Sequence, residues 1–178
     1  MKNNLKTQIE NIAKQAQVTS RELAILSSAA KNAVLKDMAL ALLSNQAVIL
    51  KANRKDIVKS RGKGKAFIDR LSLDEARIKQ MVDALLDIAK FKDPVDEVMR
   101  AWNTDNGLSI QKVRSPIGVV AIIYESRPNV TADCIGLCFK SGNSVILRGG
   151  SQALNSNLAI FNLAKEVMQR HGLPEGAI

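Results

Sequence analysis

The chain has 178 residues, 46% of them apolar, and its 26 Lys and Arg residues exceed its 17 Asp and Glu residues to leave a net charge of +9. Enough apolar residues are present to form a hydrophobic core, which excludes intrinsic disorder as the main state. No apolar stretch reaches about 18 residues without a charge, which excludes a membrane span, and two cysteines are too few for a disulfide framework, which predicts a cytoplasmic protein.

The first part of the chain predicts helices. Apolar residues recur at helical spacing over 5–16, and Thr19-Ser20 then offers an N-cap for a second helix over about 21–44. That second helix is apolar over much of its surface, so we expect it to be buried on more than one side.

Two further helices follow. One is expected over 46–60, where the glycines of loop 61–64 end it. Ser72, with Glu75 three residues later, has the pattern of a capping box, which predicts a helix that stops before Asp93-Pro94.

A dense basic run lies between residues 51 and 65, with Asp56 as its one acidic residue. It is either a patch for phosphate or nucleic acid or the solvated face of a helix and loop, and we favour the solvated face. Aromatic residues make up only 3% of the chain, so no stacking platform for single strands is expected. The basic residues are Lys51, Arg54, Lys55, Lys59, Arg61, Lys63 and Lys65.

The pattern then changes to strands. Segments 98–102 and 108–113 flank Asn106-Gly107, a dipeptide that favours positive φ, and the second segment alternates apolar and polar residues. This predicts a β-hairpin. Two strands alone are marginally stable in water, so we expect the hairpin to pack on its own domain or on another subunit.

The last third of the chain has the order strand, helix, strand, helix. The continuously apolar run 117–124 is typical of a strand buried on both faces of a parallel sheet. A helix over 129–141, a second strand over 144–148 and a long helix over about 152–170 complete an α/β fold with a parallel sheet. Residues after Gly172 lead toward another strand, so we expect the chain to be the N-terminal portion of a longer protein.

Two loops follow the two parallel strands and carry the candidate site. Ligands of open parallel sheets bind at the carboxyl ends of the strands, and a right-handed crossover places these loops side by side. They offer two guanidinium groups, two serine hydroxyls, a glycine pair that permits close backbone approach, and two helix N-termini, which together suit a phosphate-bearing ligand. The alternative is a tight glycine turn with Arg148 in a surface ion pair. The loops are Tyr124-Glu125-Ser126-Arg127-Pro128-Asn129 and Arg148-Gly149-Gly150-Ser151.

The segment 115–151 closely resembles the γ-glutamyl phosphate reductase (glutamate-5-semialdehyde dehydrogenase) family of the aldehyde dehydrogenase superfamily. Further matches in the expected order extend the resemblance over essentially the whole chain. The motifs that carry it are Pro116-Ile117-Gly118-Val119, Ile123-Tyr124-Glu125-Ser126-Arg127-Pro128-Asn129-Val130-Thr131, Ser141-Gly142-Asn143 and Val145-Ile146-Leu147-Arg148-Gly149-Gly150.

The resemblance implies an aldehyde dehydrogenase-like architecture, truncated after its first part. Residues 1–97 would form the helical part of the cofactor-binding domain and 98–114 a hairpin of the oligomerisation element, anchored by Trp102 and Ile110. Residues 115–178 would form the first β-α-β-α of a Rossmann-like NADP-binding sheet, and the catalytic domain would be absent. The expected partners are a small-molecule substrate and further copies of the chain, with neither nucleic acid nor membrane.

The resemblance also implies the chemistry, which is NADPH-dependent reduction of L-glutamate 5-phosphate to L-glutamate 5-semialdehyde and phosphate in proline biosynthesis. A cysteine thiolate beyond Ile178 would displace the phosphate, so this chain alone would be inactive. The expected cofactor-binding residues are Tyr124, Glu125, Arg148, Gly149, Gly150 and Ser151, and the expected substrate or phosphate loop is Ser126, Arg127 and Asn129.

NADPH is expected over NADH because of two positions. Relatives that prefer NAD have a lysine and, three residues later, a carboxylate that binds the adenosine ribose. Arg148 and Ser151 stand there instead, which removes the carboxylate that would repel a 2′-phosphate. The place of the oxyanion-binding asparagine of many aldehyde dehydrogenases falls on Glu125, so the oxyanion donor stays unassigned.

The remaining reactive residues favour structural roles. Cys134 and Cys138 lie one turn apart on an apolar helix, which predicts core thiols, and without two more ligands they form no metal site. His171 ends a helix, where it complements the helix dipole. Two other functions stay open: another NAD(P)-dependent aldehyde dehydrogenase that oxidises a free aldehyde, and a basic helical module that binds nucleic acid through residues 51–65.

Overall fold

The computed structural model describes residues 2–178, and the side chains from residue 4 onward. The described residues form helices, a hairpin and a two-stranded parallel sheet. In chain order the elements are α1 (Lys2–Ala24), α2 (Ser28–Ser44), α3 (Gln46–Lys59), α4 (Lys65–Leu71), α5 (Glu75–Lys90), β1 (Val98–Asn103), β2 (Ser109–Val113), β3 (Val119–Ile123), α6 (Pro128–Lys140), β4 (Ser144–Arg148), η1 (Ser151–Ala153), α7 (Leu154–Arg170) and η2 (Glu175–Ala177).

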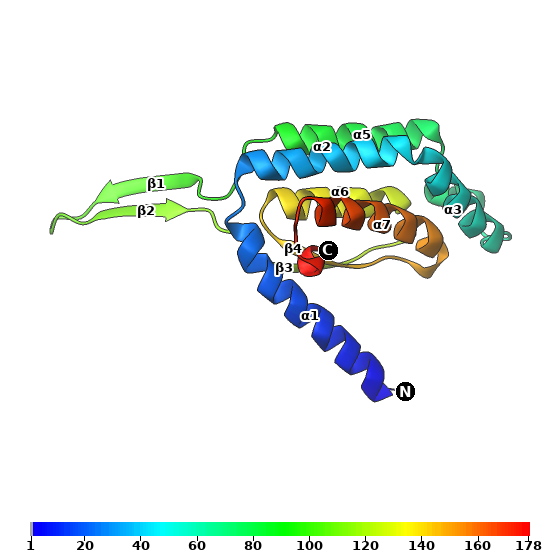
Figure 1. The fold of residues 1–178 in the computed structure, drawn as a ribbon, viewed down its shortest axis with the longest axis horizontal. Coiled ribbons are helices and arrows are strands. Elements are labelled where there is room, and N and C mark those ends of the chain that lie inside the picture. Colours follow the sequence, from blue (N-terminus) through cyan, green and yellow to red (C-terminus); the bar gives the residue numbers. More distant parts are fainter. Residues whose placement is uncertain (1) are drawn as a thin grey trace.

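The main body is layered (Figure 1). Helices α2 and α5 lie side by side in the outer layer, and α6 and α7 lie between them and the strands β3 and β4. One apolar core joins the layers, because Ile78 of α5, Phe139 of α6 and Val145 of β4 are all buried in it. The prediction of an α/β fold is confirmed.

The break between the first two helices was predicted too early. Helix α1 continues to Ala24, and Ser27 caps α2 by accepting a hydrogen bond from the Ala30 amide at 3.2 Å. Ser20 is instead buried inside α1, where its hydroxyl donates to the Gln17 carbonyl at 2.9 Å. A hydroxyl bonded within its own helix is not available as a cap.

The predicted capping box is also wrong. Asp74, not Ser72, caps α5, and its carboxylate accepts from the Arg77 amide at 2.7 Å. Ser72 ends the short helix α4, which the sequence did not predict, and donates its hydroxyl to the Ile68 carbonyl at 2.7 Å.

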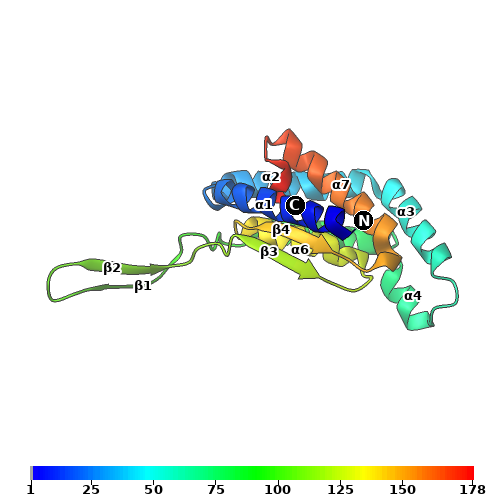
Figure 2. The ribbon, with the colours of Figure 1, turned by 90° about the horizontal axis from the view of Figure 1, so that it is seen from below.

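The hairpin is confirmed, and it projects from the body as a long arm (Figures 1 and 2). Strands β1 and β2 pair antiparallel with Trp102 opposite Ile110, and Gly107 has a φ of +84° in the turn. Every residue of both strands is exposed, so the hairpin does not pack on its own domain.

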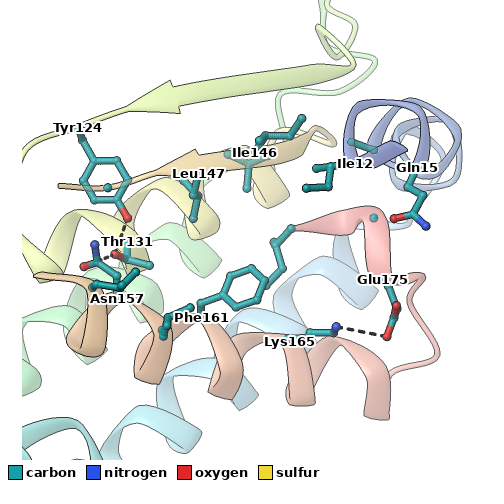
Figure 3. A pocket seen from close by; sticks show the side chains of 17 residues that line it. Ile12, Gln15, Tyr124, Thr131, Ile146, Leu147, Asn157, Phe161, Lys165 and Glu175 are labelled. Atoms are coloured by element: carbon teal, nitrogen blue, oxygen red, sulfur yellow. Dashed lines mark hydrogen bonds and ion pairs between the residues drawn. The ribbon is translucent and has the colours of Figure 1, made fainter. Parts of the chain in front are cut away.

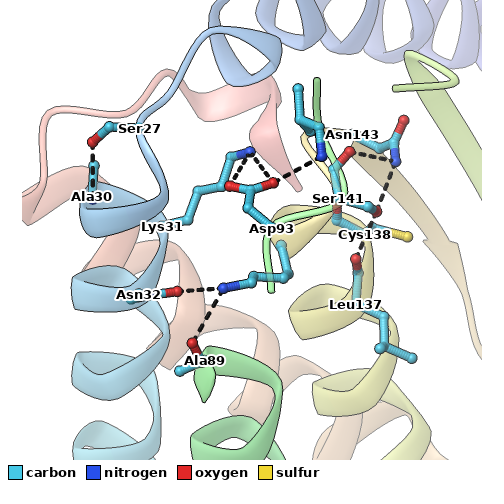
Figure 4. Close-up of polar contacts among 12 residues, drawn as sticks. Ser27, Ala30, Lys31, Asn32, Ala89, Asp93, Leu137, Cys138, Ser141 and Asn143 are labelled. Atoms are coloured by element: carbon cyan, nitrogen blue, oxygen red, sulfur yellow. Dashed lines mark hydrogen bonds and ion pairs between the residues drawn. The ribbon is translucent and has the colours of Figure 1, made fainter. Parts of the chain in front are cut away.

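A buried ion pair holds the root of this arm (Figure 4). Lys31 of α2 is fully buried, and its Nζ lies 3.0 Å from Asp93 Oδ2 in the segment that leads from α5 to β1. Nearby, the Lys140 ammonium donates to Asn32 Oδ1 at 2.5 Å and to the Ala89 carbonyl at 3.2 Å. Burial lowers the pKa of Lys140, and the Lys31 charge acts in the same direction while Asp93 opposes it.

The parallel sheet has the predicted order, with β3 and β4 paired in register from Val119 with Ser144 to Ile123 with Arg148. The prediction that β3 is buried on both faces is wrong, because Ala121 and Ile123 are exposed and the other residues are half-buried. The reason is that, among the described residues, β3 packs mainly against β4 and α1, so part of its surface is left uncovered. No single helix of residues 2–178 is long and apolar enough to cross a membrane, and α2 with α3 passes that test only as a pair bent by 68°.

Candidate functional site

The two predicted loops do lie side by side at the carboxyl ends of β3 and β4. The Tyr124 amide donates to the Arg148 carbonyl at 3.1 Å, and Ser126 donates its hydroxyl to Gln152 Oε1 at 2.9 Å. A Cβ on Gly150 would lie only 2.2 Å from Ser126 Oγ. The glycine is therefore required for the contact between the loops.

Tyr124 points inward, toward Thr131 of α6 and Asn157 of α7 (Figure 3). Its hydroxyl lies 2.8 Å from Thr131 Oγ1, which donates to Asn157 Oδ1 at 3.1 Å. A Cβ on Gly149 would come within 2.2 Å of the Asn157 amide nitrogen, so this glycine also makes room for the protein's own side chains. Burial raises the pKa of Tyr124 and keeps its hydroxyl protonated.

The exposed part of the site carries the charged residues. Arg148 and Ser151 are both exposed, and Arg148 forms no ion pair within residues 2–178. Glu125 and Arg127 pair with each other, with 2.5 Å between Arg127 Nε and Glu125 Oε1. The two loops thus bring all the predicted site residues to one end of the sheet but divide them between an inward and an exposed side.

One of the two helix N-termini predicted for the site already binds a side chain of the protein itself. Two donors at the N-terminus of α7, the amides of Asn155 and Ser156, donate to the buried Asp56 carboxylate at 3.2 and 2.7 Å, and the Ser156 hydroxyl donates to it at 2.6 Å. The prediction that both helix N-termini are free for a ligand is therefore wrong for α7. Asp56 was visible in the sequence only as the one acid in a basic run, and nothing there signalled its burial.

Two pockets flank the loops. The first, of about 370 Å³, lies between β4, α7, α1 and the C-terminal residues, and is mostly apolar (Figure 3). It includes residues of β4, which has β3 as its one strand partner in the described residues. The second pocket, of about 400 Å³, joins Arg127 and Asn129 to residues of α4 and α5, which the sequence analysis missed.

The two cysteines do not have the properties of a nucleophile. Cys138 is buried, and burial raises its pKa to about 11, while burial also raises the pKa of the half-buried Cys134 thiol. A nucleophilic cysteine needs a lowered pKa to form its thiolate. His171 follows α7 and lies 2.7 Å from Asp37 of α2, a surface contact far from the loops. No group of three or more His, Cys, Asp or Glu side chains in the described residues could hold a metal ion.

Comparison with known proteins places the chain in a family. The sequence model of the aldehyde dehydrogenase family matches residues 1–178, so the chain belongs to this family. The chain is 51% identical over 173 residues to the γ-glutamyl phosphate reductase of Caldanaerobacter subterraneus subsp. tengcongensis, covering 96% of this chain and 42% of that protein. It is 48% identical over 177 residues to the enzyme of the same name from Clostridium novyi, covering 98% and 42%.

Solved structures agree. The crystal structure of γ-glutamyl phosphate reductase from Thermotoga maritima superposes with a TM-score of 0.91 at 41% identity, covering 94% of this chain and 41% of that one. The enzyme from Saccharomyces cerevisiae gives a TM-score of 0.87 at 31% identity, covering 94% and 44%. The resemblance stated from the motifs is thus confirmed, and the chain spans about two fifths of the length of these relatives.

Proposed function

We propose that this chain is the N-terminal part of an enzyme that reduces L-glutamate 5-phosphate to L-glutamate 5-semialdehyde and phosphate, with NADPH as the reductant. The observation that supports this best is the identity of about half the residues, over nearly the whole chain, with proteins named for that activity. The two loops at the sheet end, which contain the family motif, are packed against each other as a shared binding site requires.

The exposed loop residues fit an NADP-type cofactor. Arg148 offers a guanidinium that forms no ion pair in the part of the chain that the structure describes, Ser151 offers a hydroxyl, and the nearby Glu125 carboxylate is neutralised by Arg127. A 2′-phosphate on the adenosine ribose is stabilised by such planar, charged donors. We infer that Arg148 and Ser151 bind this phosphate and that Gly149 and Gly150 keep the loop close to Tyr124 and Ser126.

The chemistry needs a thiolate and a hydride. NADPH, when bound, supplies the hydride. The thiolate displaces phosphate from the acyl phosphate and is released again when the thioester is reduced to the aldehyde. Because Cys134 and Cys138 have raised pKa values within α6, we expect the nucleophile outside residues 1–178 and no turnover by this chain alone.

The projecting hairpin supports the proposal of a homo-oligomer. Trp102 and Ile110 face each other across the two strands and stay 40% and 36% exposed. Large apolar residues on an isolated hairpin are stabilised when a second subunit covers them. The division into domains at residues 97 and 114 and the cytoplasmic location stay predictions.

The cofactor assignment is tested with Ser151→Glu in the protein made from the complete reading frame. A carboxylate at this position repels the 2′-phosphate. The substitution is therefore expected to weaken the binding of NADPH by about 1–3 kcal/mol, the range of charge-assisted contacts, and to have a much smaller effect on the binding of NADH. The values of kcat/KM for both cofactors measure this. Equal losses for NADPH and NADH would contradict the placement of Ser151 at the 2′ position.

A further inference from the structure

The second pocket described above has a composition that suggests which part of a substrate it binds. It lies between the α4–α5 segment and the start of α6, and its lining includes positively and negatively charged side chains. Arg127, which precedes α6, and Asn129, in the first turn of α6, form one side. The residues that complete it are Asp69, Arg70, Ser72, Leu73, Arg77, Gln80, Met81, Ala84 and Asp133.

Asp133 is the first unusual member. Its carboxylate is half-buried, and the one side chain that bonds it in the described residues is Asn129, whose Nδ2 donates to Oδ2 at 3.3 Å. No Lys or Arg in residues 4–178 forms an ion pair with it. A partly buried carboxylate without a cation costs folding free energy, and such a residue is explained if a positively charged ligand completes it.

The pocket contains one arginine that is bound by neighbouring residues and one that is exposed. Arg77 is held in place, because its guanidinium donates to the Ser72 carbonyl at 2.8 Å and pairs with Asp69 at 2.8 Å. Arg70 is exposed and forms no ion pair within the described residues. The pocket therefore offers a guanidinium at Arg70 and a carboxylate at Asp133 that form no ion pair with any side chain of residues 4–178.

We propose that this pocket binds the α-amino-acid end of the substrate, with Asp133 receiving the α-ammonium group and Arg70 the α-carboxylate. The inference rests on the function proposed above, whose substrate carries these two groups at the end away from the acyl phosphate. Asn129 holds Asp133 and donates to the same end of the ligand. A site for phosphate alone gains nothing from Asp133, because its carboxylate would repel the anion.

The position of the pocket fits a substrate that reaches the cofactor loop. Arg127 lines the pocket, and the adjacent Ser126 contacts Gln152 and the Gly150 position of the second loop. A substrate with its amino-acid end between Asp133 and Arg70 therefore extends its other end along the β3–α6 loop toward Gly150. This assigns recognition of the substrate's two ends to two different parts of the same chain.

The test measures two aldehydes as substrates, both for the unmodified protein from the complete reading frame and for its Asp133→Asn variant. L-glutamate 5-semialdehyde and 5-oxopentanoate differ only in the α-ammonium group. We expect the unmodified enzyme to prefer the first in kcat/KM by tenfold or more, since sites that bind a polar group reject the analogue without it. In Asp133→Asn the ratio of the two kcat/KM values falls to about two or less, while kcat/KM for 5-oxopentanoate stays within about twofold of its value in the unmodified enzyme. Equal losses for both aldehydes, or an unchanged preference, would overturn the proposal.

Asp83→Asn is the matched control, because Asp83 is an exposed carboxylate of α5 that pairs with Lys79 and does not line the pocket. It is expected to keep the full preference. Arg70→Gln gives a second variant at an exposed position where folding is not at risk. It should raise KM for glutamate 5-semialdehyde at least fivefold and leave KM for 4-aminobutanal, which has no α-carboxylate, unchanged. Equal increases for both compounds would contradict the role of Arg70.

A binding measurement separates this inference from the proposed function. Calorimetry of L-glutamate and glutarate needs no turnover, and we expect L-glutamate to bind at least tenfold tighter to the unmodified protein but not to Asp133→Asn. If this preference is present but no aldehyde is turned over, the proposed reaction fails and the pocket assignment stands. If the aldehydes are turned over and neither preference depends on Asp133, the pocket assignment fails and the reaction stands.

Discussion

The helical body and the hairpin arm of this chain bury their apolar residues to opposite degrees. In the body, Leu35, Ile78 and Ile160 are fully buried among side chains of six helices and the sheet. In the arm, all residues of β1 and β2 are exposed, including Trp102. The body therefore contains most of what stabilises it, whereas nothing in residues 2–178 covers the apolar residues of the arm.

The joint between the two regions is polar. Asp93 lies where the chain leaves α5 for the arm, and it receives both the Lys31 ammonium and, at 3.0 Å, the Val95 amide. A buried ion pair fixes a direction better than apolar contacts do, because its hydrogen bonds are directional. The segment that leads into the arm is thus anchored to the body.

The largest expected effect comes from breaking this joint. Lys31→Met leaves Asp93 without its cation, and the loss of one partner of a buried pair costs about 3–5 kcal/mol of unfolding free energy. Adding Asp93→Asn should recover a large part of the loss, since the amide keeps the contact with Val95 without a charge. Denaturant unfolding measures both variants. A loss below about 1 kcal/mol in Lys31→Met would show that the pair does not stabilise the body.

A substitution in the hairpin arm is expected to have a smaller effect on folding and a large effect on assembly. Trp102→Ser removes an exposed side chain, so it should change unfolding free energy by no more than about 0.5 kcal/mol. If the arm binds another subunit, the dissociation constant for self-association should rise at least about tenfold, which corresponds to about 1.4 kcal/mol. Sedimentation of the protein from the complete reading frame measures this, with Ile25→Ser, at a side chain 85% exposed on the body, as the control. A monomer at micromolar concentration would contradict the role of the arm.

The smallest effect concerns pH. Burial raises the pKa of Asp133 above its ordinary value of 3.8, so the folded protein binds more protons than the unfolded chain in this range. Stability is therefore lost as the pH rises from about 3.8 through the folded pKa, and the loss is constant above it. Asp133→Asn removes this loss and should raise the Tm by about 1–3 °C at pH 7 but not below pH 3.5. A lower Tm at pH 7 would mean that the charged carboxylate has a stabilising partner.

Local patterns in the sequence were sufficient where a few neighbouring residues decide the structure. Asn106-Gly107 fixed the hairpin turn, and the apolar run before Tyr124 identified a parallel strand. The patterns failed where the deciding partner is distant in the chain. Asp56 caps a helix about one hundred residues later, and Lys31 meets Asp93 across 62 positions, so neither burial could be read from nearby residues.

The same distinction explains the site. The two loops could be placed side by side from the sequence because their residues are consecutive and follow strands. Asp133 and Arg70 could not be placed together from the sequence, because one lies on α6 and the other on α4, and only the tertiary fold brings them to one pocket. The glycines of the second loop also have a structural role that the sequence did not predict, since Gly149 and Gly150 make room for Asn157 and Ser126.

The phosphate dependence of aldehyde oxidation tests the proposed reaction most directly. The protein from the complete reading frame, given L-glutamate 5-semialdehyde and NADP⁺, should reduce the cofactor only when inorganic phosphate is present, because phosphate must take the acyl group from the thioester. The account predicts a rate that rises with phosphate and falls to background without it. A rate that is independent of phosphate would contradict the account and indicate an aldehyde dehydrogenase that releases a free acid to water.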